Sequence, residues 1–307
     1  MDTVYPDRST GRRTALARWI ADSKNPLTAR VAVNQIWMRH IGQPLVASVF
    51  DFGVHGDPPT HPELLDWLAV EFMEKGWSMK AIHRAIVISN AYRMRSDLAG
   101  NHTSHAKDPD NRYLWRMVSR RMEAESIRDA LLTVGGNLDP AMGGPELDQN
   151  QGLSSRRRSI YFRHAPEKQM VFLQLFDAAS VTECYRRSES IVPQQGLALA
   201  NSPLAIAQSR VVAKRLVDGK SADAIDASEF VRQTFEVVLS RAPAEQELAA
   251  CVEFLESQSQ RLANAKAMTR FTGGEKNEVP PSEDPQQRAR ENLVHVLLNH
   301  HDFVTIH

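Results

Sequence analysis

The sequence contains very little cysteine. Two cysteines occur in 307 residues, Cys184 and Cys251, and they lie far apart and outside any CxxC pair. Two residues cannot supply the disulfide framework of a small secreted domain or a cysteine-based zinc site, and no CxxCH motif is present to attach a c-type haem. We therefore expect no metal site and no cofactor in this chain, while one bridge between the two cysteines stays open.

The sequence also lacks long apolar runs and an excess of charge. No run approaches the ~20 apolar residues that cross a bilayer, so we expect no membrane span. Lysine plus arginine equals aspartate plus glutamate, 37 against 37, which gives no overall field that favours nucleic acid. Residues 1–13 are polar and charged, without the apolar core of a secretory signal, and by themselves predict a cytoplasmic chain or a piece of a longer protein.

Complete catalytic motifs are missing as well. The sequence has no G-x-S-x-G, no G-x-x-x-x-G-K-[ST] and no G-x-G-x-x-G motif. The tripeptide Asp51-Phe52-Gly53 matches one kinase motif, but the glycine-rich loop, strand lysine and HRD loop of a kinase are absent. The residues alone leave open whether the chain is an enzyme.

Helical patterns dominate what is present. Apolar residues recur at helical spacing along most of the chain. The predicted helices cover residues 14–21, 26–42, 61–75, 78–92, 119–133, 167–178, 193–200, 203–217, 227–239, 244–263 and 286–299. The best strand candidate is the run SIYF at 159–162. The sequence therefore predicts a mainly α fold, a multi-helical array with orthogonal packing, long irregular loops and at most a minor short strand pair.

Several residues mark where these helices begin and end. Thr60 and Glu63 form a T-x-x-E pattern, which predicts a capping box at the helix that follows. Ser78 is the predicted N-cap of the next helix. Gly42 and Gly76 are predicted C-terminal stops, because glycine adopts the left-handed conformation that ends many helices.

We expect a single helical domain over residues 1–307. An N-terminal helical block of about residues 10–95 precedes a polar crossing, and a central and C-terminal helical region follows over about 110–305. The segment of about 266–285, which contains TGGEKNEVPPSEDP, has the glycine, proline and charge content of a flexible excursion.

The loop of residues 51–61 is the most conspicuous candidate site. It places Asp51, His55 and His61 beside glycines and prolines that shape a turn. A histidine with a carboxylate can form an acid–base pair, so these three are the candidate catalytic residues. The competing interpretation is architectural, and the sequence favours it, because His61 already fits the start of a helix.

Arginines gather further along the chain, at Arg156, Arg157, Arg158 and Arg163, with Arg186 and Arg187 nearby in sequence. Guanidinium groups bind phosphate, sulfate or carboxylate in a bidentate manner, so the first four are the candidate ligand-binding residues. The alternative is a set of ion pairs with nearby acidic residues on a solvated face.

An ordered set of motifs links the chain to a known family. They are LARWIADSKNPLTARVAVNQIWMRHIG (16–42), DFGVHGDPPTHPELLDWLA (51–69), SMKAIHRAIVISNAYR (78–93), DPDNRYLWR (108–116), RRMEAESIRDALL (120–132), MGGP (142–145), RRSIYF (157–162), VPQQGLALANSP (192–203) and VHVLLNHHDF (294–303). From about residue 10 to about 305, the sequence resembles the planctomycete-type domain of unknown function 1553. In relatives this domain is the C-terminal part of large secreted proteins, behind an uncharacterised domain and often a cytochrome-c-like haem domain.

The resemblance implies an extracytoplasmic setting, periplasmic or secreted, and an upstream domain or companion chain as partner. It supplies no catalytic residue. The leading hypothesis is a non-catalytic binding or scaffolding module of a multidomain protein associated with haem-containing or polysaccharide-processing systems, with an anionic or glycan ligand. The alternatives are a hydrolase that acts on a glycan or sulfated ligand through the 51–61 loop, and an electron-transfer partner.

Overall fold

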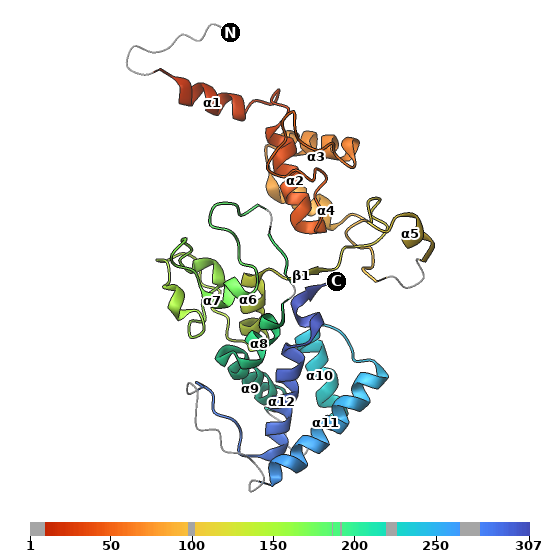
Figure 1. Ribbon diagram of the computed structural model, residues 1–307, viewed down its shortest axis with the longest axis vertical. Helices are drawn as coiled ribbons and strands as arrows, with labels where there is room; N and C mark the ends of the chain where they lie inside the picture. Colours follow the sequence, from red (N-terminus) through yellow and green to blue (C-terminus); the bar gives the residue numbers. More distant parts are fainter. Residues whose placement is uncertain (1–9, 98–101, 186, 191, 219–225, 265–276) are drawn as a thin grey trace. The chain divides into compact units, whose positions relative to one another are not determined.

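The chain is mainly helical (Figure 1). The computed structural model describes residues 10–97, 102–185, 187–190, 192–218, 226–264 and 277–307. Within them, twelve α-helices are joined by long irregular segments and one short strand pair, which confirms the predicted fold class. No helix in this described part is long and apolar enough to cross a membrane.

The chain divides into two compact units. Unit 1 comprises Met1–Arg120 with His307, and unit 2 comprises Arg121–Ile306. Each unit has its own cluster of buried hydrophobic side chains. The expectation of one domain over residues 1–307 stays a prediction.

The described part of unit 1 contains five helices: α1 (Arg12–Ile20), α2 (Thr28–Ile41), α3 (Pro62–Glu74), α4 (Met79–Val87) and α5 (His102–Lys107). Helix α2 packs against α3 and α4. Their shared core contains Val33, Leu68 and Ile82, none more than 2% exposed. Helix α1, in contrast, has no buried residue.

The loop that follows α2 is anchored to the body of unit 1. The Asn34 amide donates to the Val46 carbonyl at 3.1 Å and accepts from the Val46 N–H at 2.9 Å. Both residues are buried, so this pair satisfies two backbone groups that would otherwise lack partners. Further along, the Thr60 N–H and hydroxyl both donate to the Leu45 carbonyl, at 2.8 and 3.2 Å.

The expected capping box of Thr60 and Glu63 is wrong. The N-cap of α3 is His61, and its side chain makes no capping hydrogen bond. The Thr60 hydroxyl donates to the preceding loop instead, and Pro62 opens the helix without an N–H that needs a partner.

Other predicted helix ends are confirmed. The Ser78 hydroxyl accepts from the Ala81 N–H and caps α4. Gly42 follows α2 with φ 92°, and Gly76 follows α3 with φ 66°. The positive φ favours glycine at Gly42, and a Cβ there would also lie 3.2 Å from Cδ of Arg120, a tight contact that the arginine side chain would have to relieve.

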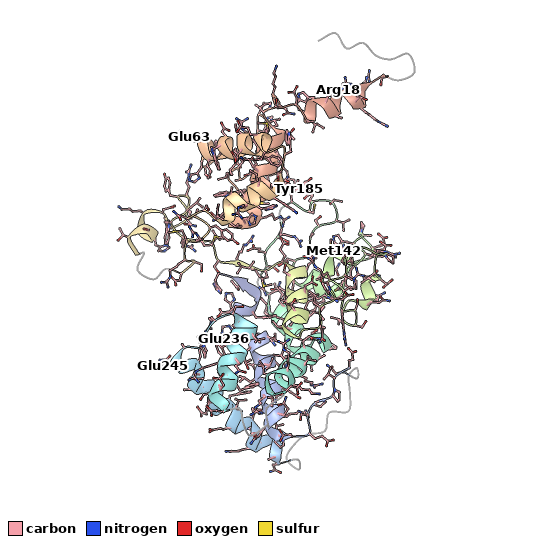
Figure 2. The ribbon with its side chains drawn as sticks, turned by 180° about the vertical axis from the view of Figure 1, so that it is seen from behind. Arg18, Glu63, Met142, Tyr185, Glu236 and Glu245 are labelled. Carbon is pink, nitrogen blue, oxygen red and sulfur yellow. The ribbon has the colours of Figure 1, made fainter. Side chains whose placement is uncertain are left out.

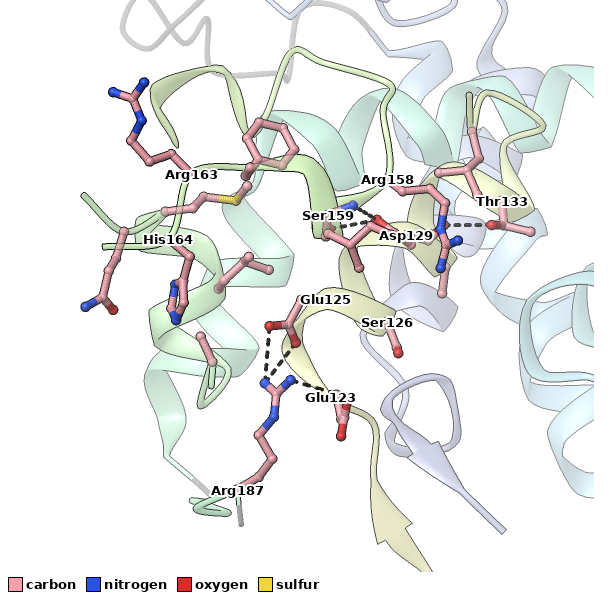
Figure 3. A pocket seen from close by; sticks show the side chains of 18 of the residues that line it. Glu123, Glu125, Ser126, Asp129, Thr133, Arg158, Ser159, Arg163, His164 and Arg187 are labelled. Carbon is pink, nitrogen blue, oxygen red and sulfur yellow. Dashed lines mark hydrogen bonds and ion pairs between the residues drawn. The ribbon is translucent and has the colours of Figure 1, made fainter. Parts of the chain in front are cut away.

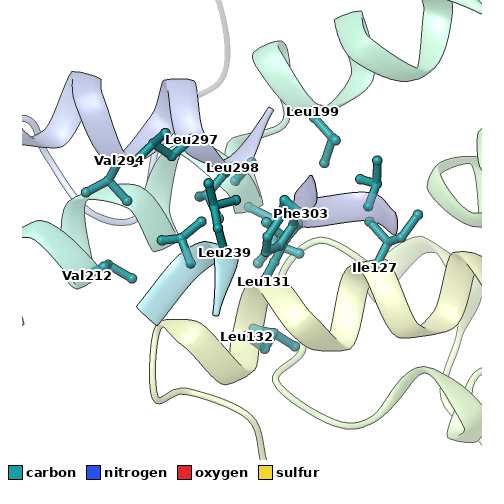
Figure 4. Packing of buried hydrophobic residues seen from close by; sticks show 14 of the residues in the cluster. Ile127, Leu131, Leu132, Leu199, Val212, Leu239, Val294, Leu297, Leu298 and Phe303 are labelled. Carbon is teal, nitrogen blue, oxygen red and sulfur yellow. The ribbon is translucent and has the colours of Figure 1, made fainter. Parts of the chain in front are cut away.

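Unit 2 is a larger helical array. Its described α-helices are α6 (Ala124–Val134), α7 (Val171–Leu175), α8 (Pro193–Asn201), α9 (Pro203–Val217), α10 (Ala227–Leu239), α11 (Glu245–Ala263) and α12 (Pro285–Leu298), and its short 3₁₀ helices are η1 (Gln149–Gln151), η2 (Ser159–Tyr161) and η5 (His301–Val304). Helix α12 packs against α9 and α11. Figure 4 shows Leu131 of α6, Leu298 of α12 and Phe303 of η5 in one buried cluster.

Two local predictions fail in unit 2. The run 159–162 is not a strand: Ser159–Tyr161 form the 3₁₀ turn η2, in which the Ser159 N–H donates to the Asp129 carboxylate, and Phe162 makes only an isolated bridge to Leu147. The helix expected over 119–133 begins only at Ala124. The residues before it form β1 (Arg120–Arg121), which pairs with β2 (Thr305–Ile306), and the Met122 N–H donates to the Val304 carbonyl at 2.8 Å.

Residues 265–276, the larger part of the expected excursion at 266–285, lie outside the described residues. The segment that follows them is hydrogen-bonded to helices. The Asn277 amide donates to the Pro203 carbonyl at 3.0 Å, Arg210 donates to the carbonyl of Val279, and the Ser282 N–H donates to the Glu291 carboxylate at 3.2 Å.

An ion cluster connects the start of α11 to η5. Arg241 donates two hydrogen bonds to the Glu247 carboxylate and one to Asp302, each at 2.7 Å. Glu247 also accepts from the Ala244 N–H at 2.8 Å. The Arg241 hydrogen bonds lower the pKa of Glu247 to about 2.

We expect Glu247→Gln to lower the free energy of unfolding at pH 7 by about 1 kcal/mol, a modest effect because the pair is partly solvated. A folded-state pKa below the ordinary value of 4.5 means that the stabilisation is complete above pH 4.5 and is lost as the pH falls toward 2. In urea denaturation at pH 7, 5 and 3, the difference in the free energy of unfolding between wild type and variant should become smaller as the pH falls. The exposed Glu236→Gln on α10 is the control, and a pH-independent difference for Glu247→Gln would contradict the argument.

Candidate ligand-binding pocket

Unit 2 contains a pocket of about 890 Å³ beside α6 (Figure 3). Helix α6 forms one wall, and the segments 158–164 and 169–173, together with Arg187, form others. Every lining residue belongs to unit 2. The volume falls within the range of about 300–1,000 Å³ that is typical of small-molecule sites.

Arg128 of α6 fixes the shape of the chain behind this pocket. Its side chain is fully buried and donates to three backbone carbonyls: Nε to Gly152 at 2.6 Å, Nη1 to Arg157 at 2.9 Å and Nη2 to Ser155 at 2.5 Å. The guanidinium also lies over the Phe162 ring, 4.8 Å from its centroid. Burial lowers the pKa of Arg128, while neighbouring Asp129 opposes that effect. One buried cation therefore clamps residues 152–157 to α6.

Asp129, the next residue on α6, positions the pocket wall at η2. Its carboxylate accepts the Ser159 N–H at 2.9 Å and the Ser159 hydroxyl at 2.7 Å. Arg128 Nη1 donates to the same oxygen at 3.3 Å. Because these bonds hold Ser159, its neighbours Arg158 and Ile160 are placed at the pocket.

The other pocket carboxylates are held by Arg187. Its Nη1 donates to both oxygens of Glu125, at 3.2 and 2.9 Å, and its Nη2 lies 3.4 Å from the Glu123 carboxylate. Figure 3 shows the Arg187 guanidinium facing both glutamates. All three acidic residues that line the pocket thus take part in hydrogen bonds or ion pairs.

Arg158 is the most loosely held cation of the pocket. Its Nε lies 3.8 Å from Asp129, and 48% of its side chain is exposed. Arg163, in contrast, donates through Nε to the Glu146 carboxylate at 2.8 Å and makes a second bond to it through Nη2. Of these two arginines, Arg158 is the more available to an anionic ligand, because its guanidinium has to break only a long ion pair with Asp129.

The remaining lining is apolar with scattered hydrogen-bonding groups. Phe162, Met170 and Leu173 are buried and form part of the wall. The polar lining side chains without a formal charge are Ser126, Thr133, Ser159, His164 and Gln169. Such a mixture suits a ligand with an apolar face and hydroxyl groups.

The structure separates the four arginines that sequence reasoning selected. Arg158 and Arg163 line the pocket. Arg156 lies 3.6 Å from Glu278, and Arg157 donates to the Gly143 carbonyl at 2.8 Å, so neither of these two is among the lining residues. A binding role for the four stays a prediction.

Sequence reasoning missed the acidic half of the pocket. Glu125 and Asp129 are four residues apart on α6 and therefore lie on one helix face. That spacing is the signal that could have identified them. Arg187 belongs to the wider group of arginines in the sequence, but its pairing with Glu125, 62 residues away, has no local signal.

The candidate residues of the 51–61 loop lie in unit 1. Asp51 accepts the Gly53 N–H through its side chain at 2.8 Å, which is a local turn interaction. His61 Nδ1 is 3.0 Å from the Thr60 hydroxyl, and His55 is exposed. A catalytic role for Asp51, His55 and His61 stays a prediction.

A smaller cavity of about 330 Å³ adjoins this loop. The loop lines it with Phe52, Gly53, Gly56, Asp57 and Pro59, and not with the three candidate residues. Any Cβ at Gly56 would lie 2.4 Å from the Asp51 carbonyl oxygen, so the close turn requires glycine there.

The described residues meet the requirements of neither a metal site nor a disulfide between the two cysteines. In the part of the chain that is described, no group of three or more His, Cys, Asp or Glu side chains could hold a metal ion. Cys184 and Cys251 form no disulfide with each other.

Comparison with known families places the chain. The family model described as "Protein of unknown function (DUF1553)" matches residues 12–255. The chain belongs to this family. The match confirms the resemblance seen in the motifs, and it includes every residue that lines the pocket of this DUF1553 protein. No curated protein and no solved structure shows significant similarity to the chain.

Proposed function

We propose that this DUF1553 protein is a non-catalytic binding module and that the pocket beside α6 binds an anionic sugar, either a sulfated sugar or a sugar acid. One observation carries the proposal: Glu123, Glu125 and Asp129 are occupied in interactions that hold the pocket together, while Arg158 is only loosely paired. The pocket walls are thus held in place before a ligand binds, and the Arg158 guanidinium is accessible to that ligand.

This arrangement supports binding over acid–base chemistry. Hydrolysis of a glycoside by two carboxylates needs one to donate a proton and the other to attack or activate water. Glu125 is engaged by two hydrogen bonds from Arg187, and Asp129 by two from Ser159. Their geometry serves to position side chains around the pocket.

The same lining supports a sugar as the ligand. Hydroxyl groups can donate to the outer lone pairs of the held carboxylates and accept from Gln169 or Ser126. The apolar wall at Met170 and Leu173 can cover the C–H face of a sugar ring. A sulfate or carboxylate substituent would then pair with Arg158, whose guanidinium geometry matches such anions.

Calorimetric titration with a chondroitin 4-sulfate disaccharide tests the proposal. We expect one site per chain and, for Arg158→Gln, an affinity lower by about tenfold or more, because a charge-assisted hydrogen bond contributes about 1.5–3 kcal/mol. Arg156→Gln is the matched control and should bind as wild type, since Arg156 does not line the pocket.

Two further titrations sharpen the result. The unsulfated disaccharide should bind more weakly than the sulfated one, and sodium sulfate alone should compete with the sulfated one. Absence of binding, or an equal loss in Arg156→Gln and Arg158→Gln, would contradict an anionic-sugar site at this pocket.

We place this activity in an extracytoplasmic multidomain protein that is associated with polysaccharide-processing or haem-containing systems. The resemblance of the motifs supports that setting, and an anionic-sugar ligand fits it. The hydrolase and electron-transfer alternatives stay predictions.

A further inference from the structure

Helix α1 presents an apolar face that none of the other described residues buries. Leu16, Trp19 and Ile20 are 56%, 53% and 44% exposed. Residues spaced by three and four positions lie on one side of a helix, so these three side chains are neighbours on a single face. Isolated apolar side chains are common at surfaces, but a contiguous exposed face that includes tryptophan indicates an interaction site.

The charge on α1 has one sign. The helix carries Arg12, Arg13 and Arg18 and contains no acidic residue. Figure 2 labels Arg18, whose side chain points away from the helix into solvent. A partner surface for α1 should therefore combine an apolar floor with an acidic rim.

Unit 2 offers such a surface on α11. A groove of about 430 Å³ lies along this helix where it meets the start of α10. Leu248, Ala249 and Val252 supply apolar side chains, and the acidic residues that line it are Glu245, Glu253 and Glu256. Among the residues that the structure describes, no basic side chain lines the groove. Leu255 is the one buried residue of this 19-residue helix; α11 packs against α12 and α10, and Glu245, Ala249, Glu253 and Glu256 are exposed.

We propose that α1 of one copy of this chain docks into the α11 groove of a second copy. Arg12 and Arg13 lie one turn before Leu16, beside the apolar face of α1, and oppose the glutamates of the groove in sign, whereas Arg18 lies on the opposite side of the helix. The apolar face fits the apolar floor, with Trp19 as the largest side chain available to fill the groove. Insertion of an amphipathic helix into a groove is an established mode of protein recognition.

The proposed contact is head-to-tail and weak. Each copy would offer α1 to one neighbour and the α11 groove to another, so the contact generates rings or open chains of copies. A nine-residue helix buries less than the roughly 1,200 Å² of a stable interface, which predicts a transient association. Because exposed charges contribute, added salt should weaken the association.

Sedimentation velocity over a concentration series tests this contact with charge-reversed variants. The first variant carries Arg12→Glu and Arg13→Glu, and the second carries Glu253→Lys and Glu256→Lys. We expect wild type to show a sedimentation coefficient that rises with concentration and falls back at 0.5 M salt, and each variant alone to stay monomeric. An equimolar mixture of the two variants should associate again, because each then meets a surface of opposite charge.

A matched control reverses two exposed charges on α4, with Lys80→Glu and Arg84→Glu, and should associate as wild type does. If wild type stays monomeric at every concentration, the proposal is overturned. That result is expected if α1 binds a different protein and not a second copy of this chain. Docking within one chain is recognised by a mixture that stays monomeric, and that result overturns the proposal as well. None of these outcomes bears on the sugar titration.

Discussion

Arg128→Met is expected to lower the free energy of unfolding by about 3–5 kcal/mol. The substitution removes the donor from three carbonyls, those of Gly152, Ser155 and Arg157, and leaves them without their present partner. Each buried acceptor that loses its hydrogen bond costs about 1–3 kcal/mol, and methionine replaces only the contact with Phe162.

Urea denaturation followed by far-UV circular dichroism measures this effect. Amide exchange should increase first in residues 152–159, which Arg128 holds against α6. Arg128→Lys should recover little, because a single ammonium cannot reach three carbonyls in the geometry of a guanidinium fork. The control Arg156→Met removes an exposed ion pair and should change stability by less than about 0.5 kcal/mol. A loss below 1 kcal/mol for Arg128→Met would show that the clamp contributes little.

Asn34→Ala should have the second largest effect, a loss of about 3 kcal/mol. Its amide pairs with both the N–H and the carbonyl of Val46, and both residues are buried. Alanine leaves the two backbone groups without partners and also creates a small void. The loop between α2 and α3 should then lose its attachment to α2 at Val46.

Tryptophan fluorescence is a suitable readout for this variant, because Trp37 lies on the same helix and is 4% exposed. Asn34→Asp is nearly isosteric and should still cost at least as much at pH 7, since it removes the donor and buries a charge against the Val46 carbonyl. Gln35→Ala, one residue along on the more exposed side of α2, should lie near wild type. If Asn34→Asp matches wild type, the amide donor is not required.

The sequence predicted the parts of this fold that depend on local contacts. Helices such as α2 and α4 follow from apolar spacing, and their ends at Gly42 and Ser78 follow from residues within one turn. Thr60 has the type and spacing of a capping residue, but its hydroxyl donates to Leu45, fifteen residues earlier. No local pattern contains that partner.

The pocket shows the same limit. The chemistry of arginine drew attention to residues 156–163, yet the three consecutive arginines have different partners. Their partners depend on how Arg128 and Asp129, about thirty residues earlier, hold this irregular segment. Sequence spacing therefore located the cluster, and only the folded chain distinguishes Arg158, which lines the pocket, from Arg156, which does not.

The most direct test of the proposed function is amide hydrogen exchange with and without the chondroitin 4-sulfate disaccharide. Binding at the pocket predicts slower exchange in α6 and in residues 158–173, and no change there in Arg158→Gln at the same disaccharide concentration. Slower exchange confined to residues 51–61 would contradict the account, because it would place the ligand at the Asp51–His61 loop and not at the pocket beside α6.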